Sequence, residues 1–179
     1  MRTLAALLAA MAVATAAVRT PAFAKAPAGK QGDAPLPAGN ASAGADIVTG
    51  KGQCLTCHRV RGAGSRLGPD LTDAGTTRRP EQLHASLVDP GAEILPENRG
   101  YRVVTRDGIT ITGRILNHDT FQVLMMDAKE QLRSFDKSTL REHGFIKESA
   151  MPSYRMTLSP QELADVIAYL VTLKGVTPQ

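Results

Sequence analysis

Apolar residues recur along this chain with two different spacings. The helical spacing is clearest in residues 160–174, where one face carries five apolar side chains. They are Leu163, Val166, Ile167, Leu170 and Leu173. Ser159 and Glu162 form a capping box at the start of this segment and Gly175 follows its end, so we predict a helix here.

Two shorter helices are predicted earlier in the chain. Residues 79–88 carry Pro80 in their first turn and an apolar stripe on one face. Residues 45–58 have a weaker helical pattern, because two glycines interrupt it.

The alternating spacing that is typical of β-strands is found in residues 101–135. Four segments alternate apolar and polar residues or are rich in β-branched ones, and turn residues separate them. They are residues 101–106, 109–116, 121–126 and 132–135. We predict a small antiparallel sheet at residues 99–144, inserted between two helical parts at residues 45–98 and 145–175.

The N-terminal stretch predicts export. Residues 4–18 are uncharged and apolar, Arg2 precedes them, and an Ala-Phe-Ala cleavage sequence ends at Ala24. We expect residues 1–24 to be a cleavable signal peptide and the protein to be periplasmic or secreted. Residues 25–44 are rich in Ala, Pro and Gly, which predicts a flexible linker.

The charge balance of the chain is close to neutral. The formal net charge of the 179 residues is +4, and the predicted leader holds two arginines and no acid, so the remaining chain carries +2. This balance gives no reason to expect a nucleic-acid partner. We also expect no membrane span once the leader is removed.

Five consecutive residues carry the clearest chemistry: Cys54-Leu55-Thr56-Cys57-His58. A Cys-x-x-Cys-His sequence is typical of covalent haem attachment. Its two thiols can each add to one vinyl group of the porphyrin, and the histidine can then bind the iron. Both cysteines of the chain are in this pentad, so we predict one covalently attached haem c.

Three other roles are open to these cysteines. A zinc site would need a second cluster of ligands, and the remaining histidines, at positions 84, 118 and 143, are scattered. A thioredoxin-like redox pair would need a βαβ context, which does not precede the pentad. A disulfide across two intervening residues is possible but uncommon.

The segment after the pentad contains candidates for the surroundings of the histidine. A metal-bound histidine usually donates its other ring N–H to a fixed acceptor, and the Pro69 carbonyl is our candidate for His58. Gly68 allows close approach of the backbone to a flat ligand, and Leu71 would pack on the ring face. A simple turn is the alternative for this stretch.

A low-spin electron carrier needs a second axial ligand, and a methionine sulfur favours reduced iron. Met151 is the preferred candidate, because Pro152 stiffens its loop and the following chain has room to wrap the ring edge. Met156 is the alternative, although it lies almost at the start of the C-terminal helix.

These elements together resemble class I c-type cytochromes, and exported haem-binding domains with a β insertion. The resemblance rests on the pentad, residues 68–71, Met151-Pro152 and the closing helix. It implies a mostly α cytochrome c fold, with three to four helices around a covalent haem and an inserted small antiparallel β-sheet. It also implies that His58 and Met151 are the axial ligands, with Pro69 as the acceptor for the histidine.

We therefore expect a protein that passes single electrons between redox partners, namely a donor dehydrogenase, a terminal acceptor or both. Five arginines near the pentad could form a docking patch for an acidic partner, or a merely solvated loop. They are Arg59, Arg61, Arg66, Arg78 and Arg79. The alternatives are a gas-binding haem sensor and a relay or interaction module of an exported dehydrogenase complex. No general base or nucleophile pair is visible, so we expect no catalytic residues and no enzymatic activity.

Overall fold

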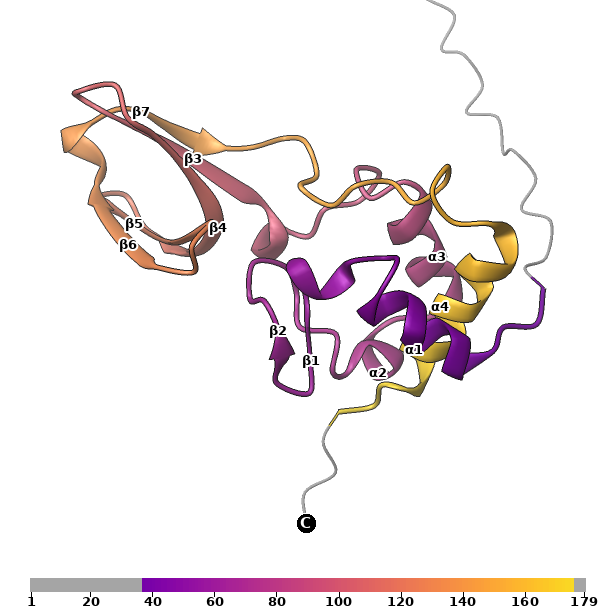
Figure 1. Ribbon diagram of the computed structural model, residues 1–179. Helices are drawn as coiled ribbons and strands as arrows, with labels where there is room; N and C mark the ends of the chain where they lie inside the picture. The colour runs from indigo at the N-terminus through magenta and orange to yellow at the C-terminus, as the bar shows by residue number, and fades with distance from the viewer. Residues whose placement is uncertain (1–36, 176–179) are drawn as a thin grey trace, which may run out of the picture. The chain divides into compact units, whose positions relative to one another are not determined.

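The computed structural model describes residues 37–175 (Figure 1). The predicted signal peptide and residues 25–36 of the predicted linker lie outside this range. In the part described, no helix has both the length and the apolar character that crossing a membrane requires.

The described residues form four α-helices. They are α1 (Ala41–Thr49), α2 (Ala74–Thr77), α3 (Pro80–Val88) and α4 (Pro160–Thr172). The prediction for α4 is confirmed: the Glu162 N–H donates to the Ser159 hydroxyl at 3.2 Å, and the Ser159 N–H donates to the Glu162 carboxylate at 2.8 Å. All five apolar residues predicted on its inner face are buried.

The helix α1 begins four residues earlier than predicted, inside the expected linker. The side-chain oxygen of Asn40 accepts hydrogen bonds from the N–H groups of Ser42 and Ala43, at 2.9 and 3.2 Å. This N-cap satisfies donors that a helix start would otherwise leave free. The helix also ends earlier, at Thr49, because the glycines that follow do not continue it.

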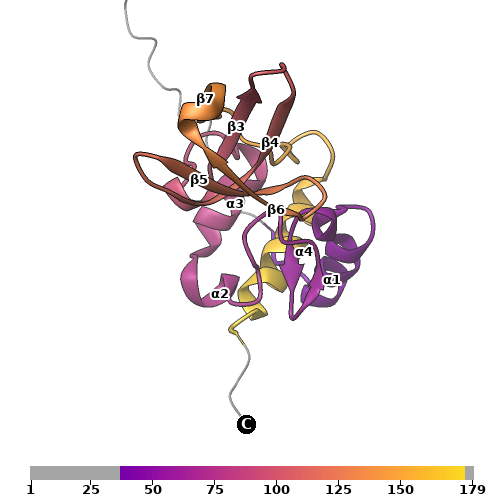
Figure 2. The same ribbon diagram turned by 90° about the vertical axis from the view of Figure 1, so that its left-hand side faces the viewer.

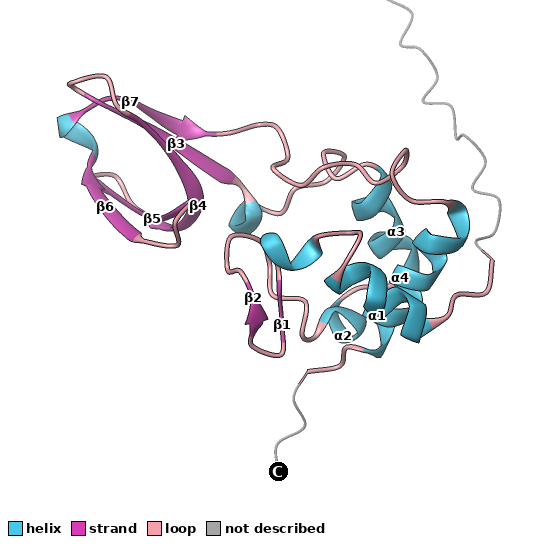
Figure 3. Ribbon diagram, in the orientation of Figure 1, coloured by secondary structure: helices cyan, strands magenta, loops and turns pink. Residues whose placement is uncertain are grey.

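The helices α1 and α4 approach each other closely (Figure 3). Gly44 is buried, and a Cβ at this position would overlap the backbone carbonyl of Asp165. The buried Asp165 carboxylate accepts a hydrogen bond from the Asn40 N–H at 2.7 Å. In α2, Gly75 meets the backbone of Val171 in the same way, so glycines set the spacing between these helices.

An antiparallel sheet follows α3 in the chain, and its strands can be traced in Figure 2. The strands are β3 (Gly100–Thr105), β4 (Thr110–His118), β5 (Gln122–Asp127), β6 (Leu132–Asp136) and β7 (Leu140–Phe145). Their order in the sheet is β6-β5-β4-β3-β7. The four predicted strands are present, and β7 is an additional edge strand that pairs with β3. A separate two-stranded hairpin joins β1 (Arg59–Val60) to β2 (Ala63–Gly64).

Apolar side chains gather in two clusters. The cluster of the helices, called the helical core below, contains Val48, Val60, Ala74, Leu83, Leu87, Leu158, Leu163, Val166, Ile167, Leu170 and Leu173. The cluster of the strands, called the sheet core, contains Tyr101, Val103, Ile115, Val123 and Met125.

The prediction of a mostly α cytochrome c fold with a small inserted sheet is therefore wrong. The structure is about 32% helical and 27% strand, and its sheet has five strands. The physical reason is that inward-facing residues of β3, β4 and β5 bury one another. They form a second core instead of adding to the helical one.

Candidate functional site at the Cys54–His58 pentad

The pentad forms a tight turn. A 3₁₀ segment, η1 (Cys54–Thr56), starts after Gln53, whose φ of 49° is left-handed. The Cys54 carbonyl accepts hydrogen bonds from the N–H groups of Cys57 and His58, at 3.2 and 2.8 Å. Both thiols are free, with Cys54 half-buried and Cys57 exposed. The turn thus presents two thiols and an imidazole from five consecutive residues.

Cys54 lies against the helical core, and burial raises the pKa of its thiol. Tyr154, which packs on the same core, donates its O–H to the Gly52 carbonyl at 2.6 Å. Burial, together with the neighbouring Cys54, raises the pKa of Tyr154 to about 12. Both groups are therefore protonated at neutral pH. Tyr154 was not predicted, because 102 residues separate it from Gly52 and no local pattern marks the contact.

The imidazole of His58 is held by its predicted neighbour. Its Nδ1 lies 2.8 Å from the Pro69 carbonyl oxygen. A carbonyl can accept but not donate, so Nδ1 carries the proton and Nε2 keeps a lone pair. Burial lowers the pKa of His58 from 6.5, and the hydrogen bond to Pro69 opposes this shift only in part. Because the net shift is downward, the ring is neutral at pH 7. The predicted contact is present, and its role in holding a metal ligand stays a prediction.

Gly68 allows the backbone to pass directly against this imidazole. Its N–H donates to the Cys57 carbonyl at 2.6 Å. A Cβ at this position would lie 2.8 Å from Cε1 and Nδ1 of His58, which is closer than real side chains approach. Leu71, two residues after Pro69, is partly buried against the helical core. Its predicted contact with a ring face stays a prediction.

The two candidate methionines lie in very different environments. Met151 is partly buried against the helical core, as are Cys54 and Leu71. Met156 is 92% exposed. The loop between them is fixed to α3, because the Ser153 hydroxyl donates to the Val88 carbonyl at 2.7 Å. Met151 is thus the methionine that shares a core with the pentad.

Two charged side chains of the sheet reach the loop beside the pentad. The Glu130 carboxylate accepts hydrogen bonds from the backbone N–H and the Nε of Arg66, both at 3.1 Å. Hydrogen bonds from Ser65 and Arg66 lower the pKa of Glu130 to about 2. The Arg114 Nη1 donates to the carbonyls of Arg66 and Gly68, at 3.1 and 3.5 Å. The sequence predicted neither the contacts of Glu130 nor those of Arg114 with this loop, because 46 to 64 residues separate the partners. These contacts are called the two tethers of the sheet below.

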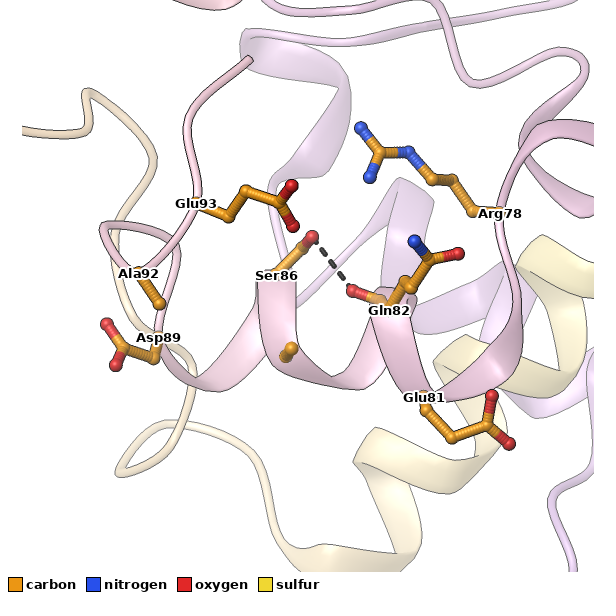
Figure 4. A pocket seen from close by; sticks show the side chains of 8 residues that line it. Arg78, Glu81, Gln82, Ser86, Asp89, Ala92 and Glu93 are labelled. Atoms are coloured by element: carbon orange, nitrogen blue, oxygen red, sulfur yellow. Dashed lines mark hydrogen bonds between the residues drawn. The ribbon is translucent and has the colours of Figure 1, made fainter. Parts of the chain in front are cut away.

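The five arginines considered for a docking patch lie in different settings. Arg66 is paired with Glu130, Arg59 is half-buried, and Arg61 and Arg79 are exposed. Arg78 lines a hollow of about 170 Å³ along α3 (Figure 4). Acidic side chains line the same hollow: Glu81, Asp89 and Glu93. Arg78 therefore adds no net positive charge to a patch, and the docking of an acidic partner stays a prediction.

The structure gives no support to a multidentate metal site. Among residues 37–175, no group of three or more His, Cys, Asp and Glu side chains could hold a metal ion. A zinc cluster at the pentad therefore has no additional ligands within this range.

The family resemblance is not supported by the fold or by comparison with known proteins. No known protein family matches the chain. No curated protein matches it either. Together with four short helices and a five-stranded antiparallel sheet, these findings make the assignment to class I c-type cytochromes, or to exported haem-binding domains with a β insertion, wrong.

Proposed function

We propose that this protein carries one haem, covalently attached through Cys54 and Cys57, and that it transfers single electrons between redox partners. The observation that supports this most is the geometry of His58. Its Nδ1–H is held by Pro69, which leaves Nε2 available to a metal. Metal-binding histidines are usually oriented by such a second hydrogen bond.

The donor set of the site fits a haem. The two free thiols stand on one turn, next to the residue whose imidazole is oriented. Gly68 puts no side chain between the loop backbone and that imidazole. Met151, which packs on the same core as Cys54, would be the second residue to hold the iron, and the exposure of Met156 argues against the alternative.

A haem bound in this way supplies reversible one-electron exchange at its iron. The protein would provide His58 and Met151 to hold the iron and would restrict the access of water, and the sulfur of Met151 would favour the reduced iron. We further propose that the protein acts in the periplasm or outside the cell. There it would exchange electrons with a donor dehydrogenase, a terminal acceptor or both, without enzymatic activity of its own.

Covalent attachment is tested on the full chain, expressed in bacteria that attach haem to exported proteins. We expect acidified acetone to leave the pigment on the protein, and the pyridine haemochrome spectrum to give one haem per chain. Cys54→Ala combined with Cys57→Ala should abolish attachment. Extraction of the pigment from the parent protein would contradict the proposal.

The second ligand is tested by the weak near-infrared band of sulfur-ligated oxidised haem. We expect Met151→Ala to lose this band and its reduced form to bind carbon monoxide rapidly. Met156→Ala is the matched control and should retain the band. If the parent protein itself bound carbon monoxide at once, the gas sensor would replace the electron carrier.

A further inference from the structure

Two arginines near the pentad carry buried N–H groups without a partner. The Nε atoms of Arg59 and Arg114 are shielded from solvent, and neither has a hydrogen-bond partner among the described residues. Buried polar groups are almost always paired, because an unpaired donor loses its hydration without compensation. Each of these groups therefore points to an acceptor that the described residues do not supply.

Both arginines border the segment that orients His58. Arg59 follows His58 directly, and its carbonyl accepts the N–H of Leu71 at 2.8 Å. Arg114 comes from β4 in the sheet, and its Nη1 reaches the Gly68 carbonyl at 3.5 Å. Gly68 is the residue that contacts the imidazole. Arg59 is thus joined to this short loop by its backbone and Arg114 by its guanidinium, from two different elements.

Neither guanidinium has a carboxylate partner in the part of the chain that the structure describes. The ion pairs of arginine there involve other arginines, whose acidic partners are Glu130, Glu142 and Asp127, and one further pair joins Lys51 to Glu162. Asp70, which is exposed, feels the charge of Arg59 as the weakest of the influences on its pKa. Beside the pentad, two half-buried guanidinium groups therefore lack an ion-pair partner among residues 37–175.

We infer that Arg59 and Arg114 bind the propionate carboxylates of the haem. This inference rests on the function proposed above. A guanidinium presents a planar fork of N–H donors that matches a carboxylate, and a haem carries two propionates for two arginines. The sheet would then take part in holding the cofactor directly, through Arg114.

The test uses the haem-loaded protein with Arg114→Gln and, separately, Arg59→Gln. The resonance Raman bending mode of the propionates reports their hydrogen bonding, and we expect it to shift in both variants. We also expect the reduction potential to fall, because the lost positive charge had disfavoured the oxidised iron. Arg114→Lys keeps the charge but loses Nε, so it should shift the Raman mode with a smaller change of potential.

Two controls separate this effect from loosening of the sheet. Glu130→Gln breaks the other tether of the sheet without removing an arginine, and Arg141→Gln removes an exposed arginine of β7. Neither should shift the propionate mode or lower the potential. The haem content of the parent is measured first: no covalent haem there would overturn the proposed function itself. One haem per chain with an unchanged propionate mode in both arginine variants would overturn this inference alone.

Discussion

The helical core and the sheet core differ in how their elements meet. In the helical core, Gly44 and Gly75 let the backbones of α1 and α2 touch that of α4, so the fit depends on missing side chains. In the sheet core, Val103, Val123 and Met125 are fully buried and fill the space between strands. Atoms added at Gly44 or Gly75 should therefore disrupt the contacts between the helices, whereas atoms removed from the fully buried positions of the sheet core should leave cavities.

The two regions also differ in what surrounds the candidate chemistry. Cys54, Leu71 and Met151 pack on the helical core. The sheet supplies two charged side chains to the loop beside the pentad, Glu130 and Arg114. The helical region thus provides the attachment residues, and the sheet provides groups that hold their loop.

The largest effect is expected for Met125→Ala in the sheet core. Met125 is fully buried, and its removal leaves a cavity that should lower the free energy of unfolding by about 3 kcal/mol. Denaturant unfolding measures this loss. Leu124→Ala, at the neighbouring and 36% exposed position, should cost less than about 1 kcal/mol. Hydrogen exchange should show α4 unaffected in Met125→Ala, and a loss of its protection would show that the two cores are not independent.

A somewhat smaller effect is expected for Gly44→Ala in α1. The added Cβ would overlap the Asp165 carbonyl, which is backbone and cannot rotate away. Separation of α1 from α4 should destabilise the protein by about 2 kcal/mol, as measured by thermal unfolding. Gly144→Ala in β7 is the matched control, because a Cβ there meets nothing within 4 Å. An equal loss in both variants would refute the contrast between the regions.

Asn40→Ala should cost about 1 kcal/mol, because it removes the N-cap of α1. Circular dichroism during thermal unfolding checks this. Asn40→Asp keeps an acceptor for the N–H groups of Ser42 and Ala43 and should behave like the parent. If Asn40→Ala were equally stable, the start of the helix at Ala41 would be in doubt.

The smallest effects concern two carboxylates, one in each region. Hydrogen bonds and ion pairs lower the pKa of Glu130 and of Glu162 from 4.5 to about 2. Their stabilisation is therefore complete above pH 4.5 and is lost as the pH falls from 4.5 towards 2. We expect Glu130→Gln and Glu162→Gln each to lower the Tm slightly at pH 7. In each variant the Tm should then fall less steeply than in the parent as the pH is lowered from 4.5 towards 2. Glu142→Gln, which breaks an exposed pair with Arg102, is the control.

Much of the local structure follows from short-range sequence patterns. The capping box and apolar face of α4 and the four alternating strands were all predicted. The contact between His58 and Pro69 was also predicted, because it spans eleven residues. Such features depend on neighbours a few residues apart, whose preferences the sequence displays directly.

Long-range contacts decided the remaining features. The edge strand β7 shows little alternation in its burial and is defined by its backbone pairing with β3. The Asn40 N–H donates to Asp165, which is 125 residues away in the chain. The contacts of Glu130 and Arg114 with Arg66 join residues that are 64 and 48 positions apart. No local sequence pattern predicts such pairs, because they form only when two distant segments pack against each other. The presence of two separate cores was not predicted either, and it overturned the mostly α fold although four of the five strands of the sheet had been predicted.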